Sequence, residues 1–139
     1  MPALKPELSE RSKYWIPKHR YYELKHFCLQ YPDWKRLYSD LEFKMGVKIP
    51  SLGTIRGAEI PDPTAKYGQL LADLQRALDL VSHAATDADP ELGSYILKAV
   101  TEGLSFVDLE MSHKIPCGKD MYYDAYRRFF WLLSQRKGI

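Results

Sequence analysis

A seam of apolar residues at helical spacing runs through the middle of the chain. Its members, separated by steps of four, three, four and three residues, are Tyr67, Leu71, Leu74, Leu78 and Val81. This spacing places them on one face of a helix and is typical of the contact that two packed helices share. We therefore expect a long helix that begins near Thr64 and serves as a central spine.

The N-terminal third of the sequence predicts two further helices. The first covers residues 17–30, and its apolar stripe consists of Tyr21, Leu24, Cys28 and Tyr31. Pro32 ends this helix, because proline disfavours a helical conformation in the residue before it. Pro32 also opens the second helix, whose stripe consists of Trp34, Leu37, Tyr38 and Leu41.

The segment between these helices and the spine has no sustained period. Residues 45–63 contain three glycines and three prolines, which predicts a loop or linker. No part of the sequence alternates apolar and polar residues for long enough to indicate a strand. We therefore predict an all-α fold, with a helical pair and linker over 1–63 and the spine and remaining helices over 64–139. At 139 residues the chain fits one compact domain.

Three shorter segments after the spine have helix signals. Asp89 suits an N-cap, and Pro90 suits the first position of a helix that ends near Gly103. Ser105 can cap a second helix, and a break over 113–118 with one aliphatic residue, Ile115, leads to a last helix that begins near Lys119. This order is the layout of a helix-turn-helix unit, although the break is longer than the usual turn.

The last helix has two faces of different chemistry. Its apolar face consists of Tyr122, Ala125, Tyr126, Phe129, Leu132 and Leu133. Its other face offers Lys119, Asp120, Tyr123, Asp124, Arg127 and Arg128. A helix that enters the major groove needs cations that bind phosphates and side chains that reach base edges. This face offers both, so double-stranded DNA is the expected partner. The alternative is a solvated face, on which Asp124 pairs with both arginines.

The segment "ILKAVTEGLSFVDLEMSHKIPCGKDMYYDAYRRFFWLLSQRK" resembles the C-terminal part of phage and prophage transcriptional regulators of the ArpU/RinA kind, which carry a sigma-region-4-like helix-turn-helix. The resemblance covers about the last 45 residues. It implies a recognition helix that carries Lys119, Met121, Tyr123, Asp124 and Arg127, with Lys114 and Arg128 near phosphates. The turn departs from the family pattern, because Pro116, Cys117 and Gly118 stand where a serine and basic residues are common.

Other kinds of chemistry have little support in the sequence. The motifs of phosphate-binding loops, zinc proteases and serine hydrolases are absent, so we expect neither catalysis nor a cofactor. His26, Cys28, His113 and Cys117 could form a zinc site only at unusual spacing, so we expect no metal and two buried, reduced thiols. No apolar run is long enough to cross a membrane, and no secretory signal is present, which indicates a cytoplasmic protein.

Charge is unevenly distributed along the chain. The net charge is +2, but residues 51–103 hold eight acids against four bases, while the segments on either side are basic. This pattern allows an anionic partner without requiring one. The leading hypothesis is a DNA-binding transcriptional regulator whose N-terminal helices form a homodimer or contact RNA polymerase. The alternative is a non-catalytic interaction or assembly adaptor that presents the aromatic N-terminal region to a protein partner.

Overall fold

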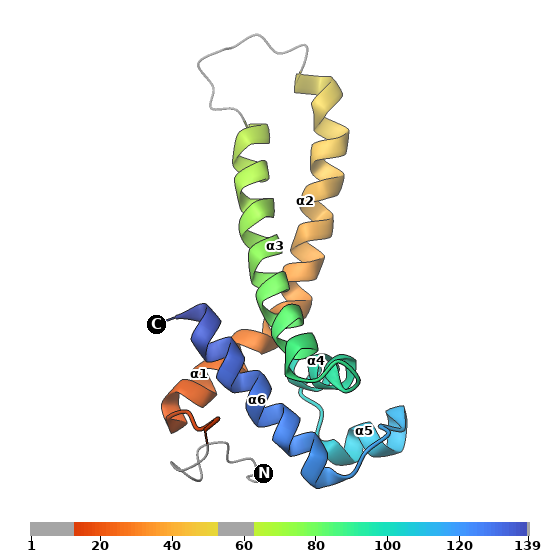
Figure 1. Cartoon of the computed structure of the whole chain (residues 1–139). Coiled ribbons are helices and arrows are strands. Elements are labelled where there is room, and N and C mark those ends of the chain that lie inside the picture. Colours follow the sequence, from red (N-terminus) through yellow and green to blue (C-terminus); the bar gives the residue numbers. More distant parts are fainter. Residues whose placement is uncertain (1–12, 53–62, 139) are drawn as a thin grey trace. The chain divides into compact units, whose positions relative to one another are not determined.

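The structure, a computed structural model, describes the backbone of residues 13–52 and 63–138, and the side chains of 13–46 and 65–138. The described residues form helices and no strand, which confirms the all-α prediction (Figure 1). The helices are α1 (Lys18–Leu29), α2 (Tyr31–Leu52), α3 (Pro63–Ala88), α4 (Gly93–Glu102), α5 (Phe106–His113) and α6 (Lys119–Lys137). None of the described helices has both the length and the apolar character of a membrane span.

The chain forms two compact units. One consists of Met1–Tyr31 and Asp79–Ile139, and the other consists of Pro32–Leu78. We refer to them as the terminal unit and the hairpin unit. The boundary predicted near residue 63 falls inside the hairpin unit.

The described part of the hairpin unit consists of α2 and the first half of α3, which run antiparallel (Figure 1). Leu41 of α2 and Leu74 and Leu78 of α3 are buried, as expected for members of the predicted seams. Leu37, also predicted in the α2 seam, is 41% exposed. The loop predicted over residues 45–63 is wrong for residues 45–52, which belong to α2. Gly46 costs a helix only about 1 kcal/mol, so one glycine does not end a helix of this length. Residues 53–62 lie outside the described part of the chain.

The junction between α3 and α4 differs from the prediction. The Oδ1 atom of Asp89 accepts hydrogen bonds from the backbone N–H groups of Glu91 and Leu92, at 2.9 and 3.0 Å. Asp89 therefore stabilises a turn, and α4 begins only at Gly93. A Cβ atom on Gly93 would lie 2.9 Å from the carbonyl oxygen of Ala85, so glycine permits a close approach to α3 that other residues would block.

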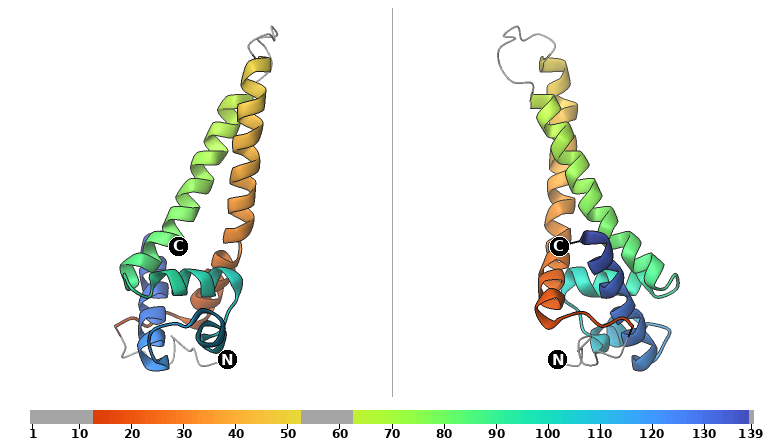
Figure 2. Two further views of the ribbon diagram at one scale, coloured as in Figure 1. Left: turned by 90° about the vertical axis from the view of Figure 1, so that its right-hand side faces the viewer. Right: turned by 60° about the vertical axis from the view of Figure 1, so that its left-hand side comes forward.

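The core of the terminal unit lies between α1, α4 and α6, which contact one another (Figure 2). Side chains from all three helices are fully or almost fully buried: Tyr21, Leu24 and Cys28 of α1, Ile96 and Ala99 of α4, and Phe129, Phe130 and Leu133 of α6. Burial of each large apolar side chain stabilises the fold by about 1.5–3 kcal/mol. Phe130 lies outside the predicted apolar stripe, so α6 buries a wider face than predicted.

Arg20 joins α1 to the C-terminal end of α6. Its guanidinium group donates hydrogen bonds to the hydroxyl and the carbonyl oxygen of Ser134, both at 3.0 Å, and to the carbonyl oxygen of Gly138. The last carbonyl groups of a helix have no partner within the helix and carry partial negative charge. A half-buried cation at this position therefore fixes the end of α6.

Candidate functional site

Local hydrogen bonds determine where α5 begins. The Ser105 hydroxyl accepts a bond from the backbone N–H of Asp108 at 3.1 Å, and the Asp108 carboxylate accepts one from the backbone N–H of Ser105 at 2.9 Å. This reciprocal pair is a capping box, which confirms the cap predicted for Ser105. The bonds from the backbone and side chain of Ser105 lower the pKa of Asp108.

The turn between α5 and α6 is anchored by one aliphatic side chain. Ile115 is buried, and its backbone N–H donates to the carbonyl oxygen of Leu109 at 3.3 Å. Lys114 ends α5 in the left-handed conformation, with φ of 52°, and its side chain is exposed. The turn therefore presents Lys114 to solvent while Ile115 holds it to the core.

The two thiols are both unoxidised but differ in burial. Cys28 is buried as predicted, and burial raises its pKa. Cys117 is only half-buried, contrary to the prediction, because it lies in the α5–α6 turn between Pro116 and Gly118, which are exposed. Burial and the nearby Asp89 raise the pKa of Cys117. Within the described residues no three metal-ligating side chains gather at one place.

The residues predicted to contact DNA fall into two groups. Lys114, Lys119, Met121 and Asp124 are exposed, whereas Tyr123, Arg127 and Arg128 are half-buried. In the described part of the chain neither Lys114 nor Lys119 forms an ion pair. These two lysines stand at either end of the α5–α6 turn.

Arg128 does not point away from the protein, which corrects the prediction for its side chain. Its Nη1 atom donates to the carbonyl oxygen of Ala88 at 2.6 Å, and its Nε atom donates to the Tyr14 hydroxyl at 3.3 Å. Its guanidinium carbon lies 5.3 Å from the centre of the Tyr14 ring. The hydrogen bond from Arg128 lowers the pKa of Tyr14. Arg128 thus holds α6 to the end of α3 and to the N-terminal segment.

Tyr123 also faces neighbouring side chains, contrary to the prediction that it points outward. Its ring centre lies 6.4 Å from that of Phe106 and 5.0 and 5.6 Å from those of Tyr122 and Tyr126. Burial raises the pKa of Tyr123, and a hydrogen bond from the backbone of Phe106 partly offsets this effect. Tyr123 therefore stabilises the contact between α5 and α6.

The acids on α5 and α6 have partners or positions within their own helices. Asp108 is part of the capping box. Asp124 lies 3.9 Å from Arg127 and 3.4 Å from Arg128. Asp120 occupies the first turn of α6, where the helix dipole favours a negative charge. Their charges are therefore partly neutralised, although Glu110 also lies exposed on α5.

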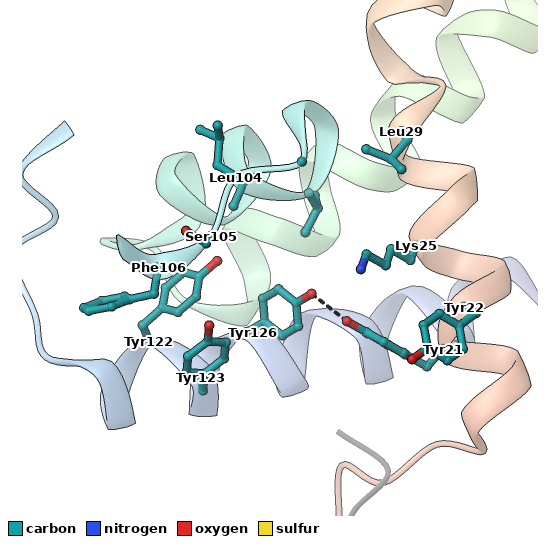
Figure 3. A pocket seen from close by; sticks show the side chains of 13 residues that line it. Tyr21, Tyr22, Lys25, Leu29, Leu104, Ser105, Phe106, Tyr122, Tyr123 and Tyr126 are labelled. Carbon is teal, nitrogen blue, oxygen red and sulfur yellow. Dashed lines mark hydrogen bonds between the residues drawn. The ribbon is translucent and has the colours of Figure 1, made fainter. Parts of the chain in front are cut away.

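A pocket of about 300 Å³ opens in the terminal unit, between α1, the end of α4 and the start of α6 (Figure 3). Five tyrosines line it: Tyr21, Tyr22, Tyr122, Tyr123 and Tyr126. The hydroxyls of Tyr21 and Tyr126 lie 2.8 Å apart and share a hydrogen bond. The sequence did not predict this pocket, because the tyrosines of α1 and α6 are about 100 positions apart and no periodicity links them.

Comparison with protein-family models, curated proteins and solved structures finds no match for this chain. The resemblance to ArpU/RinA regulators therefore stays a prediction.

Proposed function

We propose that the chain is a non-catalytic transcriptional regulator that binds double-stranded DNA through α5, the following turn and the start of α6. The observation that carries this proposal is the pair of exposed lysines, Lys114 and Lys119, on either side of a turn that Ile115 anchors. A helix presented by a fixed turn can enter a major groove with its first residues toward the bases. Cations beside it can bind the phosphates.

The placement of side chains divides the predicted contacts into roles. Lys119 and Met121, exposed in the first turn of α6, are positioned to reach base edges. Lys114 and Arg127 are assigned to phosphates, because Arg127 is half-exposed and has only a 3.9 Å ion pair with an exposed acid. Tyr123 and Arg128 hold α6 in position, and neither is assigned a direct contact with DNA. Asp124 moderates the charge of both arginines.

The proposal is tested by removing two of these cations. The variant Lys119→Ala with Arg127→Ala should bind a labelled 30-base-pair duplex about ten-fold or more weakly, because charge-assisted hydrogen bonds contribute about 1.5–3 kcal/mol each. Fluorescence anisotropy in low salt measures the affinity. The matched control is Lys66→Ala with Arg76→Ala, which removes the same charge from exposed positions of α3. Equal affinities for the two variants would exclude the proposed interface.

An interaction or assembly adaptor is the second candidate function. Val107 and Met111 lie one helical turn apart on α5, and Met111 is 75% exposed. Exposed apolar side chains on one face are typical of protein–protein contacts. Binding of a protein partner at this face should be lost in the Met111→Lys variant. Its affinity should change little as the salt concentration rises, which distinguishes this function from DNA binding.

Three further expectations accompany the leading proposal: homodimerisation, contact with RNA polymerase and a cytoplasmic location. Homodimerisation and contact with RNA polymerase follow from the regulator hypothesis alone. Sedimentation velocity of the purified chain tests the first of them, and a dimer would match the two half-sites that helix-turn-helix proteins commonly bind.

A further inference from the structure

We propose that the tyrosine-lined pocket of the terminal unit binds a small aromatic anion, a flat ring that carries a carboxylate or a phosphate. This inference goes beyond DNA binding and does not depend on it. All residues that line the pocket belong to the terminal unit.

The pocket contains a buried hydroxyl that has no partner among the described residues. Tyr122 is 1% exposed, and within the described part of the chain its hydroxyl forms no hydrogen bond. Buried polar groups almost always have a hydrogen-bond partner, and leaving one without costs about 1–3 kcal/mol. Because Tyr122 lines the pocket, a ligand with an acceptor atom would satisfy this hydroxyl (Figure 3).

The charge of the pocket selects an anion. Among the described residues that line it, Lys25 is the one with a charged side chain, and none carries a carboxylate. Lys25 is half-buried and extends from α1 toward the tyrosines of α6 (Figure 3). It forms no ion pair within the described residues. Burial raises the pKa of Tyr122 and Tyr126, so both phenols stay protonated and can donate to an anion at neutral pH.

The walls of the pocket select a flat ring. The rings of Tyr21 and Tyr22 lie 5.2 Å apart in a tilted arrangement, and those of Phe106 and Tyr122 lie 5.5 Å apart. Aromatic rings associate at such distances through offset or edge-to-face contacts. The alanine and valine side chains of α4 add an apolar wall. A volume of about 300 Å³ lies at the lower end for small-molecule sites, which suits one ring system and one anionic group.

Isothermal titration calorimetry of the full chain without DNA tests the proposal with two matched pairs of probes. The first pair is indole-3-acetate and indole-3-acetamide, and the second is AMP and adenosine. We expect the anion of at least one pair to bind ten-fold or more tightly than its neutral partner. The pair that shows this preference identifies an aromatic acid or a nucleotide as the source of the ligand.

Two substitutions in the pocket and one control locate the binding. Lys25→Met keeps the aliphatic stem of the side chain, and this variant should bind the anion and its neutral partner with about equal affinity. Lys18→Met, at an exposed position of the same helix, should keep the preference for the anion. Tyr122→Phe should weaken binding of the anion several-fold without lowering the melting temperature. No binding of any probe, or a preference that Lys25→Met leaves unchanged, would overturn the proposal. Either result would leave the DNA-binding proposal unaffected.

Discussion

Arg127 and Arg128 are neighbours in the chain and are almost equally exposed, at 35% and 34% of their side-chain surface. Their partners nevertheless differ. Arg128 donates to a backbone carbonyl, a tyrosine hydroxyl and an acid, whereas Arg127 has one long ion pair. Exposure alone therefore does not distinguish a structural arginine from one available to a ligand. The hydrogen-bond partners of the two side chains make this distinction.

This difference predicts unequal effects on stability. Arg128→Met should lower the free energy of unfolding by about 1–2 kcal/mol, because the carbonyl oxygen of Ala88 loses a charged donor. Arg127→Met should lower it by less than about 0.5 kcal/mol, as is usual for an exposed ion pair. Urea unfolding at pH 7, followed by circular dichroism, measures both values. Equal losses would contradict the structural role of Arg128.

Tyr126 predicts how stability depends on alkaline pH. Burial raises its pKa well above the ordinary phenol value of 10.0, so the folded protein retains the proton that the unfolded chain releases. The stability that the neutral phenol contributes is therefore complete below pH 10 and is lost as the pH rises above it. Urea unfolding between pH 9 and 11 should show a falling free energy of unfolding, with a shallower slope in Tyr126→Phe.

Tyr14 supplies the opposite control for that experiment. Its pKa is lowered, chiefly by the hydrogen bond from Arg128, so its ionised form is favoured in the folded state. Tyr14→Phe should therefore not make the alkaline slope shallower. A shallower slope in Tyr14→Phe, or an unchanged slope in Tyr126→Phe, would show that the pH dependence arises elsewhere.

At the scale of elements, the helix limits that were predicted correctly are those that depend on local signals. The Ser105 cap and the last helix from Lys119 were predicted where the structure has them, because a cap or a break acts within a few residues. The start of α4 was missed because it depends on the close approach of Gly93 to Ala85, a tertiary contact. The end of α2 was missed because the loop was predicted from the glycines and prolines of residues 45–63 and not from the helix that precedes them.

The capping box of α5 gives a prediction at this scale. Ser105→Ala should lower the free energy of unfolding by about 1 kcal/mol, because the N–H of Asp108 loses its acceptor. Ser112→Ala, exposed in the last turn of the same helix, should change it by less than about 0.5 kcal/mol. Hydrogen exchange of the α5 amides, measured with urea unfolding, would show whether the loss is local. Equal effects of the two substitutions would contradict the cap.

At the scale of the whole molecule, the helical fold could be predicted from apolar periodicity, but the surface of the candidate site could not. The sequence placed Tyr123 and Arg128 on an outer face because it showed one apolar stripe on α6. In the structure α6 also contacts the side chain of Phe106 on α5, the backbone carbonyl of Ala88 at the end of α3 and the side chain of Tyr14 in the N-terminal segment. Only the arrangement of these elements shows that Lys114 and Lys119 flank the anchored turn as exposed cations that form no ion pair within the described residues.

The salt dependence of DNA binding tests this conclusion most directly. The slope of log affinity against log salt reports the phosphates that a protein neutralises, at about 0.9 per phosphate. Anisotropy titrations of wild type and of Lys114→Ala with Lys119→Ala, between 50 and 300 mM NaCl, should give slopes that differ by about 1, because of these two lysines only Lys114 is assigned to a phosphate. The Lys66→Ala, Arg76→Ala control should keep the wild-type slope. Identical slopes for wild type and the Lys114, Lys119 variant would contradict DNA binding at the start of α6.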